Sequence, residues 1–283
     1  MEFQRVAVLG IGLIGGSFAL ALKKHGLARH IVGVARREET RQEALDSGVC
    51  DEVSADAVAA ARSADLVFLA SPVGAMPGLC AQIAPVVAPG CLVTDGGSTK
   101  ERVVRECEPL FSGAHFVGGH PMAGSAQTGP GAARADLFQG AAWILTPTSS
   151  TNTDALDTMR ELVTVFGARI VEMAPGAHDE LLAVSSHLPH LTASALVHSF
   201  LKSKADAPQI ADLVAGGWRD STRVAAGSAE MWRDICLDNG PCVERALPEF
   251  VREVEQLRGL VSRRDGAALE RWLDEAAIER KKF

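Results

Sequence analysis

The chain has 283 residues, which is long enough for two modest domains that each bury a core. Hydrophobic residues make up 47% and charged residues 22%, the composition of an ordinary globular protein. Lys and Arg total 28 against 35 Asp and Glu, and this formal net charge of −7 argues against nucleic acid or an anionic membrane as the main partner.

The first half of the chain alternates short, β-rich apolar runs with helical stretches. This alternation predicts a parallel sheet with helices on both faces, a doubly wound α/β fold of the Rossmann type. Two further runs, 142–145 and 168–172, flank a helical stretch near 154–166, and we expect them to extend the same sheet. The predicted strands are 5–9, 31–35, 65–70, 91–95 and 115–117, and the predicted helices are 15–25, 39–47, 76–87 and 99–111.

Beyond residue 173 the pattern is helical only. Apolar residues recur there at helical spacing, which predicts an all-α domain whose apolar face forms a homodimer interface. We therefore expect one domain over 1–173 and a second over 174–283. The residues that carry the pattern are Leu247, Phe250, Val251, Val254, Leu257, Leu260, Val261, Leu269, Trp272 and Leu273.

A glycine motif stands between the first predicted strand and the first predicted helix. Gly10 permits a tight turn, Gly12 lets the backbone approach a pyrophosphate, and Gly15 allows close helix–strand packing. The helix start then directs its free N–H groups at the phosphates. In this setting the motif strongly indicates dinucleotide binding, with predicted contacts at Gly10, Gly12, Leu13, Ile14, Gly15 and Ser71.

The end of the second predicted strand indicates which dinucleotide is bound. NAD-dependent enzymes usually carry Asp or Glu there to bind the ribose 2′-hydroxyl. This chain has Ala35 at that place, followed by Arg36 and Arg37, and an arginine fork can hold a 2′-phosphate through two hydrogen bonds. The pattern favours NADP, with NAD possible; the alternative is that both arginines are solvated surface charges.

His120 lies in the most unusual segment of the chain, Val117-Gly-Gly-His-Pro-Met-Ala-Gly-Ser125. The segment follows a predicted strand, so we expect His120 in a loop at the carboxyl end of the sheet, where open α/β sheets bind ligands. Small neighbours leave room for a substrate, and the pKa of histidine suits proton transfer near neutral pH. Ser98 follows the preceding strand and is expected at the same crevice, as a hydrogen-bonding group, as the N-cap of the next helix, or as both.

Ser185-Ser-His187-Leu-Pro189-His190 interrupts a helical stretch in the second half. Pro189 cannot donate a hydrogen bond to the carbonyl of Ser185, so we expect a kink that aims side chains into a cavity. For His187, a buried and fully packed histidine is an equal alternative.

A second polar cluster in this half contains Arg219, Asp220 and Arg223. Arg223 is the better candidate for binding a carboxylate, because a guanidinium offers two parallel hydrogen bonds. The alternative is a solvated surface arginine.

Together these motifs resemble the TyrA family of prephenate and arogenate dehydrogenases. The resemblance rests on the glycine motif, Gly-Gly-His-Pro-Met-Ala-Gly, Ser-His-Leu-Pro-His, Trp-Arg-Asp-Ser-Thr-Arg and Met231-Trp-Arg-Asp234, in the family's order along nearly the whole chain. It implies an NAD(P)-dependent oxidative decarboxylation of prephenate or arogenate on the pathway to tyrosine. It also implies a site in the cleft between a dinucleotide-binding domain and a helical substrate-binding domain that forms the homodimer.

The resemblance also implies roles for single residues. His120 matches the catalytic histidine that polarises or deprotonates the ring C4 hydroxyl as hydride leaves C4. Ser98 matches the serine that hydrogen-bonds this hydroxyl. No metal and no covalent nucleophile is implied. The predicted substrate-binding residues are His190 and Arg223, with His187 and Asp220 in support, and Ser125.

One position departs from the family's pattern. Many relatives carry a glutamate where this chain has Ala126, so any role of that glutamate in gating or substrate choice is absent here. The match at His190 favours prephenate, whereas Ala126 and the NADP-type second strand favour arogenate. We therefore expect both substrates to turn over.

Two other function classes fit the sequence less well. A β-hydroxyacid-type dehydrogenase shares the two-domain plan, but Lys202 and Lys204 have no Asn nearby to complete its catalytic pair, and His120 stays unexplained. A non-catalytic redox sensor leaves the His, Ser and Arg set without a role. The absence of tyrosine excludes classes that use a tyrosine hydroxyl as acid or base.

Cysteine spacing and the chain start complete the expectation. The six cysteines show no metal or disulfide pattern, and no signal peptide or bilayer-spanning run is apparent. We expect a cytoplasmic enzyme that acts on a small molecule, without a nucleic-acid or membrane partner.

Overall fold

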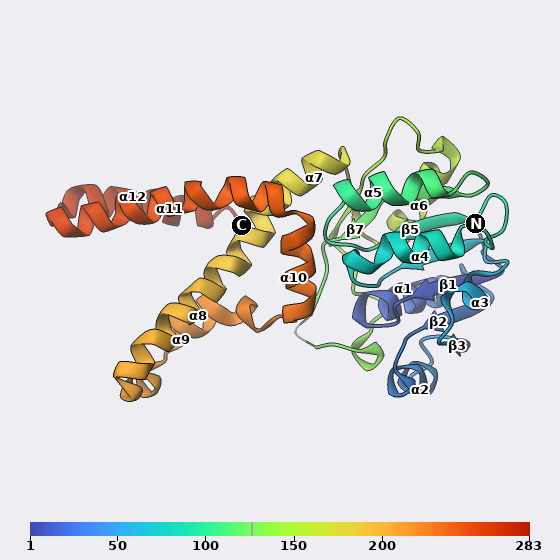
Figure 1. Ribbon diagram of the computed structural model, residues 1–283, viewed down its shortest axis with the longest axis horizontal. Helices are drawn as coiled ribbons and strands as arrows, with labels where there is room; N and C mark the ends of the chain where they lie inside the picture. The colour runs from blue at the N-terminus through green and yellow to red at the C-terminus, as the bar shows by residue number, and fades with distance from the viewer. Residues whose placement is uncertain (126) are drawn as a thin grey trace.

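The computed structural model describes residues 1–125 and 127–283. Figure 1 shows a part that holds the β-sheets, and helices that extend away from it as two arms. The strands lie before residue 173, and the described residues beyond it form helices and their connections. None of the described helices has an apolar stretch that could cross a membrane.

A six-stranded sheet forms the centre of the first part. Its strand order is β3-β2-β1-β4-β5-β6, and each neighbouring pair is parallel, so the predicted doubly wound fold is confirmed. The central strands are buried along their whole length, because helices cover both faces of a parallel sheet. The strands are β1 (Val6–Leu9), β2 (Ile31–Val34), β3 (Glu52–Ser54), β4 (Leu66–Leu69), β5 (Leu92–Asp95) and β6 (His115–Val117).

The later strands do not extend this sheet, so that expectation is wrong. They form a separate sheet of order β7-β8-β9, in which β7 is antiparallel to β8 and β8 is parallel to β9. The chain enters β7 through Gly118, where a Cβ atom would lie 2.3 Å from the hydroxyl of Thr146. This close passage lets residues after β6 pair with β8. The strands are β7 (Gly119–Pro121), β8 (Ala142–Leu145) and β9 (Arg169–Glu172).

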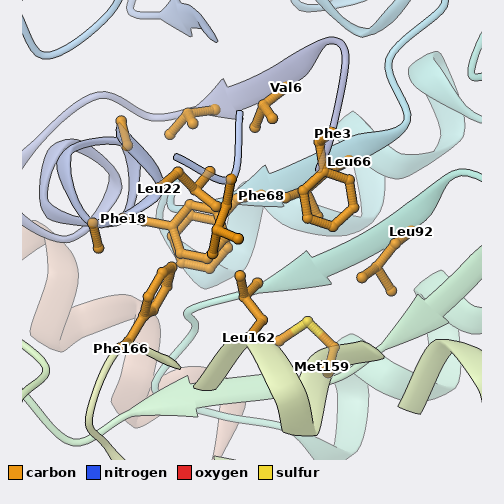
Figure 2. Close-up of a cluster of buried hydrophobic side chains, with 14 of the residues drawn as sticks. Phe3, Val6, Phe18, Leu22, Leu66, Phe68, Leu92, Met159, Leu162 and Phe166 are labelled. Atoms are coloured by element: carbon orange, nitrogen blue, oxygen red, sulfur yellow. The ribbon is translucent and has the colours of Figure 1, made fainter. Parts of the chain in front are cut away.

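Helices pack on both faces of the six-stranded sheet. On one face, shown in Figure 2, Phe18 of the first helix stacks on Phe68 of β4 with ring centroids 3.9 Å apart, and Leu162 closes the same cluster. On the other face the third to fifth helices pack on β1, β4 and β5. The helices are α1 (Leu13–Lys24), α2 (Glu38–Asp46), α3 (Ala57–Ala61), α4 (Met76–Ile83), α5 (Glu101–Cys107) and α6 (Thr153–Val165).

The predicted interruption of the helix near Ser185 takes the form of a π-helical turn, Ala183–His187. Pro189 lies in the first turn of the next helix, where its missing N–H removes no helical hydrogen bond. The turn therefore re-aims the chain without ending it, as π segments do at many functional sites. The helices here are α7 (Pro175–Leu182), α8 (Leu188–Asp206), α9 (Gly216–Thr222), α10 (Ala229–Asp238), α11 (Gly240–Arg263) and α12 (Gly266–Arg280).

Candidate active site

A cleft of about 720 Å³ follows the carboxyl ends of β1, β2 and β4. This edge of an open parallel sheet is where ligands of doubly wound folds bind. Helix α10 reaches the cleft from the helical part and adds Glu230, Arg233 and Asp234 to its wall. Of the predicted cofactor contacts, the cleft is lined by Gly10, Gly12, Arg36, Arg37 and Ser71.

The glycine turn has the shape that a pyrophosphate requires. Gly10 has φ +111°, and a Cβ there would lie 2.6 Å from the backbone of Ala70. A Cβ at Gly15 would lie 2.1 Å from the carbonyl oxygen of Gly10, whereas Gly12 faces open space. Helix α1 begins directly afterwards with no side-chain cap, so its first N–H groups are free for an anion. The turn therefore fits a dinucleotide.

Leu13 and Ile14 are half-buried in the first turn of α1 and do not line the cleft. Their backbone N–H groups belong to the free helix start, so any contact they make with a phosphate is through the main chain. The Ser71 hydroxyl is buried in the cleft wall and has no hydrogen-bond partner among residues 1–125 and 127–283. A buried hydroxyl of this kind is available to a ligand.

The rim beyond β2 is basic. Arg36 and Arg37 are exposed where they line the cleft. Arg41 holds the backbone below them, because its guanidinium donates to the carbonyl oxygens of Ala35 at 2.7 Å and Arg36 at 2.8 Å. The two arginine side chains are thus presented on a fixed turn.

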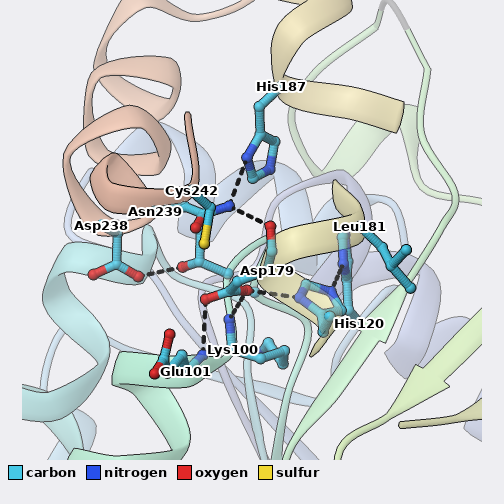
Figure 3. A network of polar contacts seen from close by, with 12 residues as sticks. Lys100, Glu101, His120, Asp179, Leu181, His187, Asp238, Asn239 and Cys242 are labelled. Atoms are coloured by element: carbon cyan, nitrogen blue, oxygen red, sulfur yellow. Dashed lines mark hydrogen bonds and ion pairs between the residues drawn. The ribbon is translucent and has the colours of Figure 1, made fainter. Parts of the chain in front are cut away.

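His120 lies inside strand β7 and not in a loop, so the predicted location is corrected. The antiparallel pairing of His120 with Ile144 gives the residue a rigid backbone. The ring is buried, and its Nδ1 lies 2.8 Å from Nε2 of His178, a residue of α7. His178 in turn places Nδ1 2.7 Å from the Asp179 carboxylate. Figure 3 shows this network between the sheet part and the helical part.

The ionisation state of Asp179 determines which nitrogen of His178 carries a proton. Its carboxylate accepts hydrogen bonds from the backbone N–H groups of Lys100 at 2.8 Å and Glu101 at 2.9 Å. Burial works to raise the pKa of Asp179, but the hydrogen bonds from His178 and from these backbone groups outweigh it, so the pKa lies below its usual value. An ionised carboxylate only accepts, and His178 Nδ1 therefore carries a proton.

The same reasoning gives the tautomer of His120. Burial lowers the pKa of His178, so this ring is neutral and its Nε2 is an acceptor. His120 must then donate from Nδ1, which leaves its own Nε2 with a free lone pair. Burial, with the positive charge of Lys100 adding to it, holds the pKa of His120 well below its usual value. The site therefore presents a neutral base.

A buried ion pair holds the backbone around His120. The Lys100 ammonium contacts the Asp95 carboxylate and donates to the carbonyl oxygen of Gly119 at 2.9 Å. Asp95 also accepts from the N–H groups of Gly97 at 2.8 Å and Gly119 at 3.0 Å. The residue before the histidine is thus held at both its polar groups.

His187 ends the π-helical turn and lies on the other side of Asp179. Asn239 donates through Nδ2 to the carbonyl oxygen of Asp179 at 2.8 Å, and the same Nδ2 lies 3.1 Å from His187 Nδ1. Burial lowers the pKa of His187 to about 4. Ser98 is half-buried, and its backbone lies beside this ring. The structure thus brings Ser98 together with the histidine cluster, which consists of His120, His178 and His187.

A second cluster surrounds His190 on α8. Its ring stacks on Trp232 of α10 with centroids 3.6 Å apart and planes 10° apart. A Cβ at Gly227 would lie 2.7 Å from the Trp232 indole nitrogen, so this glycine permits the stack. Arg223 begins the short segment Arg223–Ala226, which packs on α8, and both Arg223 and Asp220 are exposed there.

Ser125 is not part of either cluster in this structure. It is exposed, and its hydroxyl accepts a hydrogen bond from the N–H of Gln127 at 3.1 Å. Its assignment as a substrate contact stays a prediction. Ala126, the position that departs from the family's pattern, lies outside the described residues.

Sequence reasoning missed the residues that hold His120, His187 and His190 in place. These side chains come from four separate segments of the chain, so no local spacing connects them. The one available signal was the pair His178-Asp179 directly after the predicted domain boundary. The missed residues are Asp95, Lys100, His178, Asp179, Trp232 and Asn239.

The Rossmann sheet, the open glycine turn and a buried histidine held by His178 define an NAD(P)-dependent oxidoreductase. The chain belongs to the prephenate dehydrogenase family. The model of the family's nucleotide-binding domain matches residues 18–172, and that of its dimerization domain matches residues 174–275.

Individual relatives cover nearly the whole chain. It is 37% identical to prephenate dehydrogenase of Bacillus subtilis over 273 residues, 96% of this chain and 74% of the relative. The structure of prephenate dehydrogenase from Aquifex aeolicus in complex with hydroxyphenyl propionate and NAD⁺ is 31% identical, with a TM-score of 0.90 over 100% of this chain and 99% of that one. Synechocystis arogenate dehydrogenase is 30% identical, with a TM-score of 0.81 over 99% of both chains.

Proposed function

We propose that this protein oxidatively decarboxylates prephenate and arogenate with NADP as the preferred cofactor, in tyrosine biosynthesis. The observation that carries the proposal is the free lone pair of His120 Nε2, held in place by His178 and Asp179. A base in this state can take the proton of a ring hydroxyl while the carbon that carries this hydroxyl is oxidised.

The chemistry divides between the cofactor and the chain. When bound, the oxidised nicotinamide ring supplies the acceptor for a hydride from ring C4 of the substrate. His120 Nε2 accepts the proton of the C4 hydroxyl, and Asp179 stabilises through His178 the positive charge that forms. The bond to the ring carboxylate then breaks, its electron pair enters the ring, and carbon dioxide leaves an aromatic product.

Substrate binding is assigned to the groups around this base. Ser98 stands beside the histidine cluster, and we propose that it hydrogen-bonds the C4 hydroxyl. Arg223 is proposed to bind a carboxylate, and Asp220 to support it. His190 is proposed to contact the substrate side chain, because the Trp232 stack holds its ring flat and fixed.

The preference for NADP is supported by the rim of the cleft. Ala35 offers no carboxylate to a ribose 2′-hydroxyl, and Arg36 and Arg37 are exposed on the turn that Arg41 holds. A 2′-phosphate placed there gains charged hydrogen bonds and meets no negative group at position 35.

The chemistry of His190 and Arg223 and the activities of the relatives both bear on substrate choice. His190 can donate to a keto oxygen of prephenate, but it gives the ammonium of arogenate no negative partner. The relatives described above include a prephenate dehydrogenase and an arogenate dehydrogenase. Arg223 can bind the side-chain carboxylate that both substrates have.

We also propose a homodimer formed by the helical half, with the domains divided at 173/174. The apolar pattern predicted along α11 is exposed to solvent in the single chain, with Val251 54% and Val254 45% exposed. Such a face is stable in water when a partner covers it. A second copy of the same face satisfies this requirement, since closed homo-oligomers bury identical surfaces.

The test is a set of four steady-state assays, with prephenate and arogenate each paired with NAD and NADP. We expect turnover of both substrates and a higher kcat/KM with NADP. Equal efficiency with the two cofactors refutes the NADP assignment alone. Absence of turnover in all four assays refutes the proposed function.

A further inference from the structure

The hydrogen bonds of Asn239 determine which ring nitrogen of His187 carries the proton. The Asn239 side-chain amide contacts the carbonyl oxygen of Asp179, which can only accept, so the amide nitrogen must face it. The same nitrogen lies 3.1 Å from His187 Nδ1 and donates its second hydrogen there. Nδ1 is therefore the acceptor, and in a neutral ring the proton is on Nε2.

The Nε2–H group of His187 is buried and has no hydrogen-bond partner within residues 1–125 and 127–283. The backbone of Ser98 lies beside the ring and raises the pKa of His187 as a weak hydrogen-bond acceptor does, but Nε2 has no partner with full hydrogen-bond geometry. A buried donor without a partner costs roughly 1–3 kcal/mol. Such a group is retained at low cost when a ligand atom completes it, and His187 lies among the residues of the candidate active site.

We propose that Asn239 is a positioning residue that holds His187 as a neutral Nε2–H donor to an oxygen atom of the substrate. The inference rests on the proposed function for the identity of the substrate. It assigns opposite tautomers to the two histidines: His120 accepts a proton at Nε2, and His187 donates a hydrogen bond from Nε2. Asp179 supports both histidines. Its carboxylate accepts a hydrogen bond from His178, which contacts His120, and its carbonyl oxygen accepts one from Asn239, which contacts His187.

Burial keeps His187 neutral. Burial lowers its pKa to about 4, the Asp179 carboxylate works against burial, and His178 adds to it. Because Asn239 is itself neutral, it orients the ring without adding charge. A donor of this kind has the same strength throughout the physiological pH range.

The first experiment reads the tautomer directly and needs no substrate. We would record ring ¹⁵N shifts of the full-length protein labelled at histidine, and identify the signals of His187 as those lost in His187→Gln. We expect a protonated-type shift at Nε2 and an unprotonated-type shift at Nδ1 at pH 7. The reverse assignment overturns the proposal even if the enzyme is active.

The second experiment replaces Asn239 by Asp and measures kcat/KM relative to the unchanged enzyme between pH 6 and 8. The new carboxylate can only accept a hydrogen bond, so Nδ1 must carry the proton and donate to it, and at pH 8 the neutral ring has no Nε2–H. At lower pH the ring becomes an imidazolium, whose pKa the carboxylate raises, and the donor returns. We expect a loss of about 3- to 10-fold at pH 8, the worth of one hydrogen bond, that shrinks towards pH 6.

Two variants separate this effect from a structural one. Asn239→Leu removes the hydrogen bonds without adding charge, and we expect a loss that does not change with pH. His187→Gln keeps a neutral N–H donor at the place of Nε2, and we expect it to retain more activity than His187→Leu. A pH-independent loss in Asn239→Asp, or equal activity of the two His187 variants, overturns the proposal.

Discussion

The imidazole of His190 lies flat on the indole of Trp232, with ring centroids 3.6 Å apart. The same indole meets His187 edge-on, with centroids 6.1 Å apart and planes at 84°. Trp232 therefore forms a common wall for two histidines that approach the site from successive parts of one bent helix. Trp232 lies on α10, the helix whose residues Glu230, Arg233 and Asp234 also line the cleft at the carboxyl ends of β1, β2 and β4.

Trp232→Ala is expected to raise KM for prephenate more than it lowers kcat, because the stack orients His190 and takes no part in proton transfer. The loss in kcat/KM is expected to be about 2- to 10-fold, which corresponds to roughly 0.5–1.5 kcal/mol for an aromatic pair. Trp232→Phe keeps a stacking surface and is the control. Identical KM values in the two variants would show that the stack does not orient His190.

His120→Ala is expected to reduce kcat by roughly two to four orders of magnitude, the usual worth of a positioned base. Cofactor affinity is expected to stay nearly unchanged, because the dinucleotide rests on a different loop. Retention of most of the activity would show that another group is the base.

His178→Leu removes the acceptor for His120 Nδ1–H, and we expect a decrease in kcat of about 10- to 100-fold, equivalent to roughly 1.5–3 kcal/mol for a hydrogen bond to a charged group. His178→Gln keeps an acceptor oxygen and is expected to lose less. Stopped-flow measurement of hydride transfer distinguishes a slower chemical step from slower product release. Equal losses in the two variants would argue against the hydrogen bond.

The thermal stability of the protein is expected to increase with pH between about 4 and 6.5. The folded-state pKa of His187 is about 4, below its unfolded value near 6.5, so the unfolded chain binds more protons in this window. The stabilisation is complete above pH 6.5 and is lost as the pH falls towards 4, with His187 contributing at most about 3 kcal/mol. Calorimetry on His187→Gln checks this, since the pH slope is expected to be shallower; an unchanged slope would contradict it.

Arg36→Ala is expected to weaken NADP at least about tenfold, or 1.4 kcal/mol, and to leave NAD nearly unchanged. The reason is that we propose Arg36 to bind the 2′-phosphate, which NAD lacks. Dissociation constants from fluorescence titration with each cofactor check this. Arg105→Ala removes an exposed arginine outside the cleft and is the control. An equal loss for both cofactors would place Arg36 on a shared phosphate.

Val254→Glu is expected to convert the dimer to monomers at micromolar concentration, because it puts a charge at the centre of the apolar face of α11. Light scattering checks the mass. Gln256→Glu adds the same charge at an exposed polar position two residues later and is expected to leave the dimer intact. A monomeric parent protein would refute the dimer itself.

The sequence was sufficient for the parts of the fold that depend on local pattern. Alternating apolar runs predicted the parallel sheet, and the glycine spacing predicted the turn around Gly12. It failed at β7, because glycines on either side of His120 suggest a loop until Ile144 is known to pair with it. Strand β3 was missed because three residues are too few to give a periodic signal. The contact of His120 with His178 was missed because the two residues are 58 positions apart in the sequence.

The Asp179 carboxylate has a further consequence for how the molecule matures. It accepts the first N–H groups of α5, a helix whose own N-cap residue supplies no side-chain cap. A chain whose helical half has not yet docked therefore has a frayed α5 and an unoriented His178 at the same time. Docking of the helical half therefore caps α5 and orients His178 through the same carboxylate. We therefore expect a substitution at Asp179 to lower stability and activity together.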